Sequence, residues 1–184
     1  IHPMQKKVAV IVSDALRYEV AQELIGELAR SKHVATLKAM LAMLPTETKY
    51  DKPALLPHRE LILYGNEDNQ VMSVDGYILD TTEKRSAHLQ KHKDGAICVP
   101  FETVAEYNQQ KNREIFKHPL VYIFHDTIDK AGHDGTAKQA AQACRDAINE
   151  LATMIPKILA SYNVTEVYVT SDHGFLFNDI DFAE

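Results

Sequence analysis

Several features that mark common protein classes are missing from this sequence. It contains no run of 18 apolar residues, which excludes a membrane-spanning helix. Its first residues, IHPMQKK, do not have the pattern of a secretory signal peptide. Cysteine is scarce, and Cys98 and Cys144 are far apart and lack the spacing of a metal site. We therefore expect reduced thiols in a cytoplasmic protein without membrane contact.

Two further signatures are missing from the charge pattern and the loops. Acidic residues outnumber basic ones and give a net charge of -6, which argues against a non-specific nucleic-acid binder with a basic surface. The segment SDALRYE follows the first predicted strand and has no glycine-rich phosphate loop, which argues against a nucleotide-binding domain. Internal repeats and linkers are absent too, so the chain of 184 residues is predicted to form one domain.

The stretch Lys6–Glu19 organises the rest of the chain. It begins with an apolar run from Val8 to Val12, which predicts a strand buried on both faces. After Asp14 the pattern changes to helical spacing, with apolar residues at Leu16, Val20, Leu24 and Leu28. Ligands of open α/β sheets bind at the carboxyl ends of strands, so Asp14 is a candidate site residue. The alternative is that Asp14 caps the following helix.

Strands and helices are predicted to alternate along the rest of the chain. We expect strands at residues 34–43, 61–63, 71–74, 77–79, 96–99, 120–124 and 164–170, and helices after residue 45 and at 81–92, 101–110 and 136–160. The dipeptide Asp75-Gly76 predicts a β-hairpin. The alternation predicts a doubly wound α/β domain, with a mostly parallel sheet and helices on both faces. Residues 55–93 are predicted to be an insertion that contains the hairpin.

Acidic residues follow three of the predicted strands. They are Asp14, then Asp126 and Asp129, then Asp172, and His125, His133 and His173 lie close to the last two groups. Carboxylates crowded at one sheet edge require a cation, and carboxylate oxygen with imidazole nitrogen suits zinc, manganese or iron. The pattern therefore predicts a divalent metal cluster. Taken separately, each motif has a plainer alternative, namely a turn with a structural histidine or a solvated surface loop.

The segment LPTETKY carries two hydroxyl groups where a helix is predicted to begin. A hydroxyl beside a metal ion can act as the nucleophile in phosphoester hydrolysis, and a helix N-terminus offers free amides for a phosphoryl oxygen. Thr46 and Thr48 are therefore candidate nucleophiles. The alternative is that each threonine only caps the helix.

Taken in order, these motifs resemble those of the alkaline phosphatase superfamily of two-metal phospho- and sulfohydrolases. The set consists of Asp14, a threonine of PTET, Asp129-x3-His133 and Asp172-His173-Gly174. More narrowly, the blocks VIVSDALRYE, MLPTETKYDKPALLPH, YIFHDTIDKAGHDG and TSDHGFLF resemble the PglZ family, the phosphatase-like component of BREX phage-resistance systems. These blocks extend from position 10 to position 177 and are specific as a set.

The resemblance implies a division of roles among the candidate residues. Asp14, Asp172 and His173 would hold one metal ion together with the nucleophile, and Asp129 and His133 would hold a second ion. Both ions are expected to be zinc, with manganese as the alternative. Within the family pattern the nucleophile corresponds to Thr48, with Thr46 as the second choice. The implied activity is that of a phosphodiesterase or nuclease-like phosphohydrolase in antiviral defence, with a phosphoester substrate such as nucleic acid or a nucleotide and other BREX proteins as partners.

One part of the superfamily pattern is missing. A further histidine ligand normally follows the Asp-His-Gly motif at some distance, whereas this sequence ends eleven residues after His173. Residues 1–184 are therefore expected to be the amino-terminal core of a catalytic domain taken from a larger protein, with one incomplete metal site and low activity in isolation. The alternative function is a non-catalytic scaffold domain of a defence complex.

Overall fold

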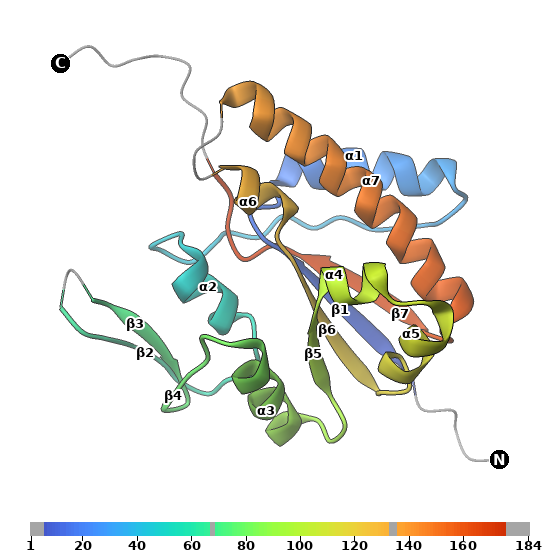
Figure 1. Cartoon of the computed structure of the whole chain (residues 1–184). Helices are drawn as coiled ribbons and strands as arrows, with labels where there is room; N and C mark the ends of the chain where they lie inside the picture. The colour runs from blue at the N-terminus through green and yellow to red at the C-terminus, as the bar shows by residue number, and fades with distance from the viewer. Residues whose placement is uncertain (1–5, 67–68, 133–135, 176–184) are drawn as a thin grey trace, which may run out of the picture.

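The centre of the molecule is a four-stranded parallel sheet (Figure 1). A computed structural model describes residues 6–66, 69–132 and 136–175. The strand order is β5-β6-β1-β7, and the strands are β1 (Val8–Ser13), β5 (Ile97–Pro100), β6 (Leu120–His125) and β7 (Glu166–Thr170). Since β1 pairs in parallel with both β6 and β7, the carboxyl ends of these three strands lie at one edge of the sheet.

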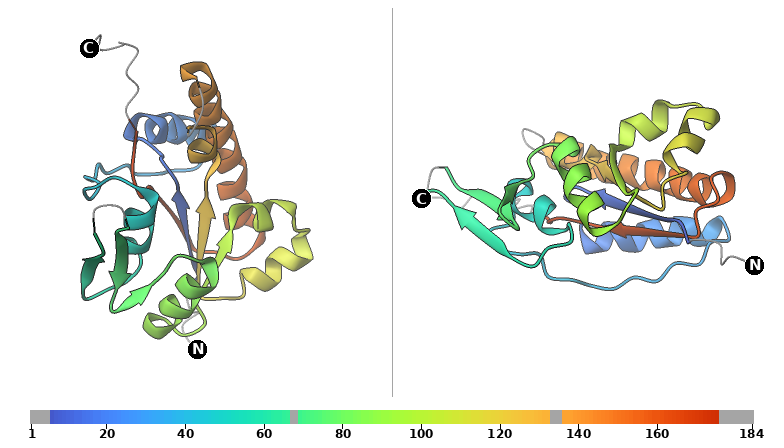
Figure 2. Two further views of the ribbon diagram at one scale, coloured as in Figure 1. Left: turned by 60° about the vertical axis from the view of Figure 1, so that its left-hand side comes forward. Right: turned by 90° about the horizontal axis from the view of Figure 1, so that it is seen from below.

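The two faces of the sheet are covered by different layers (Figure 2). Ala9 and Ile11 of β1 belong to a core shared with α1 (Tyr18–Arg30), α4 (Phe101–Glu106) and α7 (Ala137–Ser161), and α5 (Gln109–Ile115) follows α4. Val10 and Val12 belong to a second core, shared with α2 (Thr48–Ala54) and α3 (Thr82–His92). Successive side chains of a strand point to opposite faces, so an unbroken apolar run serves both cores. The predicted α/β fold class is confirmed.

A second, smaller sheet packs beside α2. Its antiparallel strands are β2 (Leu61–Tyr64), β3 (Val71–Val74) and β4 (Tyr77–Ile78), in that order. The predicted hairpin is confirmed, because Asp75 and Gly76 form the β3–β4 turn with φ of 50° and 82°. A turn of this kind needs positive φ at both positions, which glycine and aspartate tolerate. Met72 and Val74 of β3 join the core that contains α2, so the small sheet supports that helix.

The prediction of a strand at residues 34–43 is wrong. This segment has no regular secondary structure, and its apolar side chains at Val34 and Leu41 are 98% and 97% exposed. Apolar composition favours a strand only where a neighbouring strand offers backbone partners, and within the described part of the chain β7 pairs with β1 alone. The helix predicted at 101–110 is instead two helices, since Asn108 caps α5 by accepting a hydrogen bond from the Lys111 amide.

The longest helix, α7, packs against α1 and the sheet. It begins with a capping box in which Thr136 and Gln139 satisfy each other's backbone amides. Its buried stripe starts with Ala140, Ala143 and Ala147, whose small side chains allow α1 to pack close to it. None of the helices in the described ranges has the length and apolar character that a membrane crossing requires.

Candidate metal and phosphoester site

Asp14 lies at the carboxyl end of β1 and is 1% exposed. Its amide donates a hydrogen bond of 2.7 Å to the carbonyl of His125, so the β1–β6 pairing extends one residue beyond β1. The helix that follows begins only at Tyr18, with Arg17 at the N-cap position and no side-chain capping bond. The alternative that Asp14 caps this helix is therefore wrong, and its carboxylate is available for other contacts.

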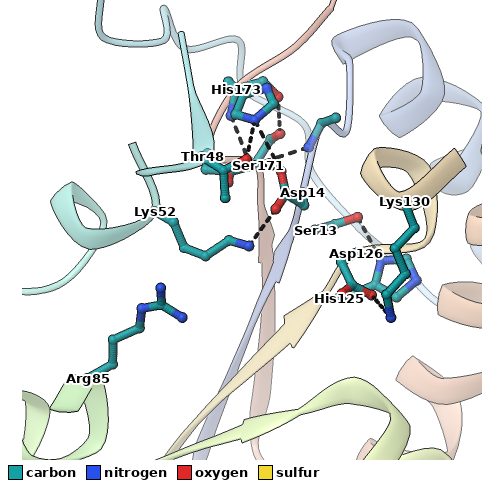
Figure 3. A network of polar contacts seen from close by, with 12 residues as sticks. Ser13, Asp14, Thr48, Lys52, Arg85, His125, Asp126, Lys130, Ser171 and His173 are labelled. Carbon is teal, nitrogen blue, oxygen red and sulfur yellow. Dashed lines mark hydrogen bonds and ion pairs between the residues drawn. The ribbon is translucent and has the colours of Figure 1, made fainter. Parts of the chain in front are cut away.

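The Asp14 carboxylate joins residues from α2 and from the end of β7 (Figure 3). Its Oδ1 atom accepts a hydrogen bond from Thr48 Oγ1 at 3.2 Å and lies 3.2 Å from His173 Nε2. Thr48 Oγ1 is also 2.8 Å from His173 Nε2. The other carboxylate oxygen forms a buried ion pair with Lys52. One carboxylate therefore contacts a hydroxyl, an imidazole and an ammonium group.

Asp172 and His173 follow β7 and face Asp14. Asp172 Oδ1 accepts hydrogen bonds from the amides of Ala15 at 3.3 Å and His173 at 3.0 Å, which fixes the orientation of the carboxylate. His173 Nδ1 donates to the carbonyl of Gly174 at 3.0 Å, so its Nε2 faces the site. One ligand atom of each of Asp14, Asp172 and His173 lies within 4.8 Å of the other two. Adjacent parallel strands thus bring these three side chains together.

Burial and the neighbouring charges shift the pKa values of this cluster in opposite directions. Burial raises the pKa of Asp14, but hydrogen bonds from His173 and Lys52 outweigh it and hold the pKa at about 2. Burial and the nearby Asp14 charge raise the pKa of Asp172 to about 6, and hydrogen bonding to Asp14 raises the pKa of His173 to about 9. Asp51 of α2 is buried as well, and burial raises its pKa. The cluster therefore favours protons or another cation.

These groups fit a divalent metal ion. Asp172 Oδ2 and both carboxylate oxygens of Asp51 are buried, and within the described residues they have no hydrogen-bond partner. A buried carboxylate oxygen without a partner is costly unless a cation or proton satisfies it. Carboxylate oxygens and imidazole nitrogens both bind zinc, and catalytic zinc sites have three protein ligands.

The remaining predicted residues lie elsewhere or outside the described ranges. Thr46 is exposed and lines a cavity of about 670 Å³ whose wall also includes Asp172 and His173. Asp129 lies in the first turn of α6 (Thr127–Gly132), after β6, and does not belong to the cluster of three ligands. His133 lies outside the described residues. The alternative that Thr46 or Thr48 caps α2 is wrong, because the N-cap residue is Glu47 and has no side-chain capping bond.

Asp126, another acidic residue after β6, has its own cation. Its carboxylate pairs with Lys130 Nζ at 2.9 Å (Figure 3). The same ammonium group donates to Glu102 at 2.6 Å. These two acidic partners raise the pKa of Lys130. Asp126 is thus neutralised just before the start of α6 and does not belong to the cluster of Asp14, Asp172 and His173.

Two cationic residues near the site were missed by the sequence analysis. Lys52 lies one helical turn after Thr48, and this spacing is the only signal that places it on the same side of α2. Arg85 projects from α3 toward the site, and its guanidinium lies 5.0 Å from the centre of the Phe124 ring (Figure 3). No local sequence pattern singles out Arg85. The helix α3 was predicted to lie in an insertion, so its residues were not considered as part of the site.

A hydrogen-bonded chain runs from the buried Ser13 and His125 to the partly exposed Glu150 beside the site. Ser13 Oγ lies 2.8 Å from His125 Nδ1, and His125 Nε2 lies 2.8 Å from Glu150 on α7. Thr127 donates a hydrogen bond of 2.6 Å to the same Glu150 oxygen. The order serine, histidine, glutamate resembles a hydrolytic triad, but Ser13 is fully buried and has no access to a substrate. This chain therefore positions β1 against β6 and α7.

Replacing Ser13 by alanine is expected to lower the free energy of unfolding by about 1–3 kcal/mol, because His125 Nδ1 would be left buried without a partner. Urea unfolding monitored by circular dichroism measures the change. The matched control is Ser73→Ala, which removes a buried hydroxyl without a hydrogen-bond partner in the described residues and is expected to be neutral or stabilising. Equal losses in the two variants would contradict the role of the Ser13–His125 pair.

The fold and the site define an alkaline phosphatase-like α/β domain, with acidic, histidine and threonine side chains gathered at the carboxyl edge of a parallel sheet. More narrowly, the chain belongs to the PglZ family. Residues 2–184 match the family model described as the BREX system PglZ alkaline phosphatase-like domain. The resemblance seen in the sequence blocks is thereby confirmed.

Two curated relatives match almost the whole chain. The alkaline phosphatase-like protein BrxZ of Escherichia coli O9:H4 (strain HS) is 36% identical over 179 residues, which cover 96% of this chain and 20% of that protein. The alkaline phosphatase-like protein PglZ of Bacillus cereus (strain H3081.97) is 32% identical over 177 residues, which cover 95% of this chain and 20% of that protein. The chain thus spans about a fifth of the length of these relatives. No solved structure matches it significantly.

Proposed function

We propose that this chain is the metal-binding core of a phosphohydrolase of a BREX defence system, with Thr48 as the nucleophile. The observation that supports this proposal most strongly is the position of the Thr48 hydroxyl, 3.2 Å from Asp14 and 2.8 Å from His173. A nucleophilic hydroxyl has to lie within hydrogen-bonding distance of the groups that activate it. The side chains of three separate elements meet there, and no capping role accounts for them.

In this proposal Asp14, Asp172 and His173 hold one metal ion, and Asp129 and His133 hold a second. Bound zinc, or manganese in its place, would neutralise the carboxylates and favour the deprotonated form of the threonine hydroxyl. The carbonyl of Gly174 keeps the His173 ring oriented, and the amides on Asp172 Oδ1 leave its Oδ2 for a ligand. Partners of this kind outside the ligand shell orient metal ligands in many proteins.

The reaction proposed for these residues is a double displacement at phosphorus. A bond forms between Thr48 Oγ and the phosphorus atom while the bond from phosphorus to the leaving alcohol breaks. The proton lost by Thr48 balances the one gained by the leaving alcohol. Water then attacks the phosphorus atom of the phosphothreonine ester, the bond from phosphorus to Thr48 Oγ breaks, a proton from the water restores the Thr48 hydroxyl, and the phosphate monoester is released. Lys52 and Arg85 supply positive charge on the side of α2 and α3, where they favour the anionic phosphoryl group.

The cavity next to the ligands supports a substrate larger than a simple phosphate. Its volume of about 670 Å³ lies in the range of sites for small molecules. The lining combines apolar residues such as Leu37 and Met40 with the basic residues Arg17 and Lys38. Such a wall suits the organic part of a phosphodiester and favours a phosphodiesterase or nuclease-like activity over release of phosphate from small metabolites.

A scaffold role is the second candidate, and the Lys52–Asp14 ion pair favours it. This lysine gives Asp14 a cation from the chain itself and lowers the need for a metal ion. Hydrolysis of a phosphodiester by the full-length protein, with zinc or manganese and with Thr48→Ala as the comparison, distinguishes the two functions. Turnover that depends on Thr48 supports the enzyme. Turnover unchanged by the substitution would contradict the proposed role of Thr48, and no turnover with no zinc bound would favour the scaffold.

A further inference from the structure

A second cluster of potential metal ligands lies in the small-sheet region, away from the site described above. Its members are Asp75, in the turn between β3 and β4, and His88 and His92 on α3. The two histidines are four residues apart and share one face of the helix, with ring centres 4.9 Å apart. One ligand atom of each residue lies within 4.8 Å of the other two. Figure 1 shows β4 and α3 as neighbours in this part of the molecule.

Backbone groups form hydrogen bonds with one polar atom of Asp75 and one polar atom of His88. Asp75 Oδ1 accepts hydrogen bonds of 2.9 Å from the amides of Arg59 and Glu60. His88 Nε2 donates a hydrogen bond of 2.7 Å to the carbonyl of Pro57, because a carbonyl can only accept. The Nδ1 atom of a neutral His88 ring therefore carries a lone pair. The backbone thus anchors each of the two side chains through one polar atom, which leaves the other polar atom to serve as a ligand.

One atom of the cluster is buried and has no hydrogen-bond partner within the described residues. His88 is 2% exposed, and its Nδ1 atom is buried without a hydrogen-bond partner in the described residues. Asp75 Oδ2 lies 3.9 Å from His92 Nε2, too far for a hydrogen bond. A buried imidazole nitrogen without a partner carries a free-energy cost, which a bound cation would remove.

The spacing of these atoms suits a metal ion. Zinc holds nitrogen and oxygen ligands at about 2.0–2.2 Å, so two ligand atoms of a tetrahedral site are roughly 3.5 Å apart. The separation of 3.9 Å and the limit of 4.8 Å are slightly larger, and small side-chain rotations would close the difference. Ligands that are themselves anchored by carbonyls and amides are typical of protein metal sites.

We propose that Asp75, His88 and His92 bind a divalent transition-metal ion. One carboxylate and two imidazole groups make zinc the expected ion. His92 is exposed, so a water molecule has access to complete the tetrahedral coordination. The ion links the β3–β4 turn to α3 through its ligands. Since β3 packs against α2, the same ion steadies the helix that carries Thr48. This site is structural and does not depend on the activity proposed above.

The test is a zinc titration of the full-length protein by equilibrium dialysis, followed by metal analysis. His92→Ala removes one ligand at the surface, and Asp75→Asn retains the oxygen that accepts from Arg59 and Glu60 but loses the charge. Each variant is expected to lose one bound zinc equivalent, or to bind it at least about tenfold more weakly. His58→Ala, an exposed histidine of the same region, is the matched control and is expected to match the wild type.

Repeating the comparison in an Asp172→Asn background separates this site from the first one. The zinc equivalent that depends on His92 is expected to remain when Asp172 is replaced, whatever the outcome at the Thr48 site. Hydrogen exchange gives a second measure, in which zinc is expected to slow exchange of the amides in residues 71–92 of the wild type and not of His92→Ala. Equal zinc content in wild type and His92→Ala would overturn the proposal, and so would unchanged exchange on zinc addition.

Discussion

Replacing Thr48 by alanine in the full-length protein is expected to lower phosphodiester turnover by about three orders of magnitude or more. The substitution removes the atom that would form the covalent bond to phosphorus, and loss of a nucleophile leaves only the catalysis from binding and charge stabilisation. Within the described residues the Thr48 hydroxyl forms hydrogen bonds only with Asp14 and His173, so we expect its loss to alter the site locally. Hydrolysis of a chromogenic phosphodiester with added zinc or manganese measures the effect.

Two matched variants define how this result is interpreted. Thr48→Ser keeps the hydroxyl and is expected to retain most of the turnover, whereas Thr46→Ala changes a threonine on the cavity wall and is expected to affect substrate binding more than turnover. The carboxylate and histidine ligands are unchanged in all three variants, so zinc content measured on each one shows whether loss of metal contributes to a loss of turnover. Turnover that survives in Thr48→Ala and is lost in Thr46→Ala would assign the nucleophile to Thr46.

The central fold was predictable because the sequences of its strands are themselves typical of buried strands. The runs at β1 and β6 are apolar at nearly every position, which is typical of strands covered on both faces, and the Asp75-Gly76 turn fixes the hairpin register. The false strand at residues 34–43 has a similar composition but lies at the surface. The composition of a segment indicates whether it can be buried. Whether a neighbouring strand is present to pair with it depends on the topology of the whole sheet.

The candidate site was predictable where topology brings strand ends together. Asp14 and Asp172 follow β1 and β7, which are neighbours in the sheet, so their convergence follows from strand order. Lys52, Asp51 and Arg85 were missed, because a charged residue on a short or polar helix looks the same in sequence whether it faces the site or solvent. The roles of Asp129 and His133 at a second ion stay predictions.

The pair His88 and His92 shows a different limit of sequence analysis. Their spacing of four residues on a helix is visible in the sequence, but the third ligand comes from a turn on a separate strand pair. What distinguishes this pair from ordinary surface histidines is the His88 ring, whose Nε2 atom donates to the carbonyl of Pro57 while its Nδ1 atom is buried without a hydrogen-bond partner in the described residues. Such a contact depends on tertiary packing and has no local pattern.

In the proposed metal site at Asp14, burial disfavours the charged form of one carboxylate. Asp14 is stabilised as a carboxylate by Lys52 and His173, while Asp172 shares the same buried space with a raised pKa. Such a buried carboxylate lowers the free energy of unfolding of the metal-free protein. A site of this kind is typical of function rather than of packing.

Replacing Asp172 by asparagine is therefore expected to have opposite effects on metal binding and on stability. Zinc affinity of the full-length protein at this site should fall at least about 100-fold, because a charged ligand becomes neutral. In the presence of a chelator, the free energy of unfolding of the same variant should exceed that of the wild type by about 2–3 kcal/mol at pH 7. This estimate follows from the rise of the Asp172 pKa from 3.8 to about 6, since one pKa unit corresponds to about 1.4 kcal/mol.

The pH dependence gives the sign of this effect. A carboxyl group whose pKa is raised by folding costs stability above its folded pKa, and the cost disappears as the pH falls through about 6 toward 3.8. The advantage of Asp172→Asn in chelator should therefore shrink between pH 7 and pH 4. Asp146→Asn, an exposed aspartate on α7, is the control and should change neither zinc binding nor stability by more than about 0.5 kcal/mol. An Asp172→Asn protein that binds zinc as tightly as the wild type would remove Asp172 from the ligand set, and one that is less stable in chelator would show that its carboxylate serves packing instead.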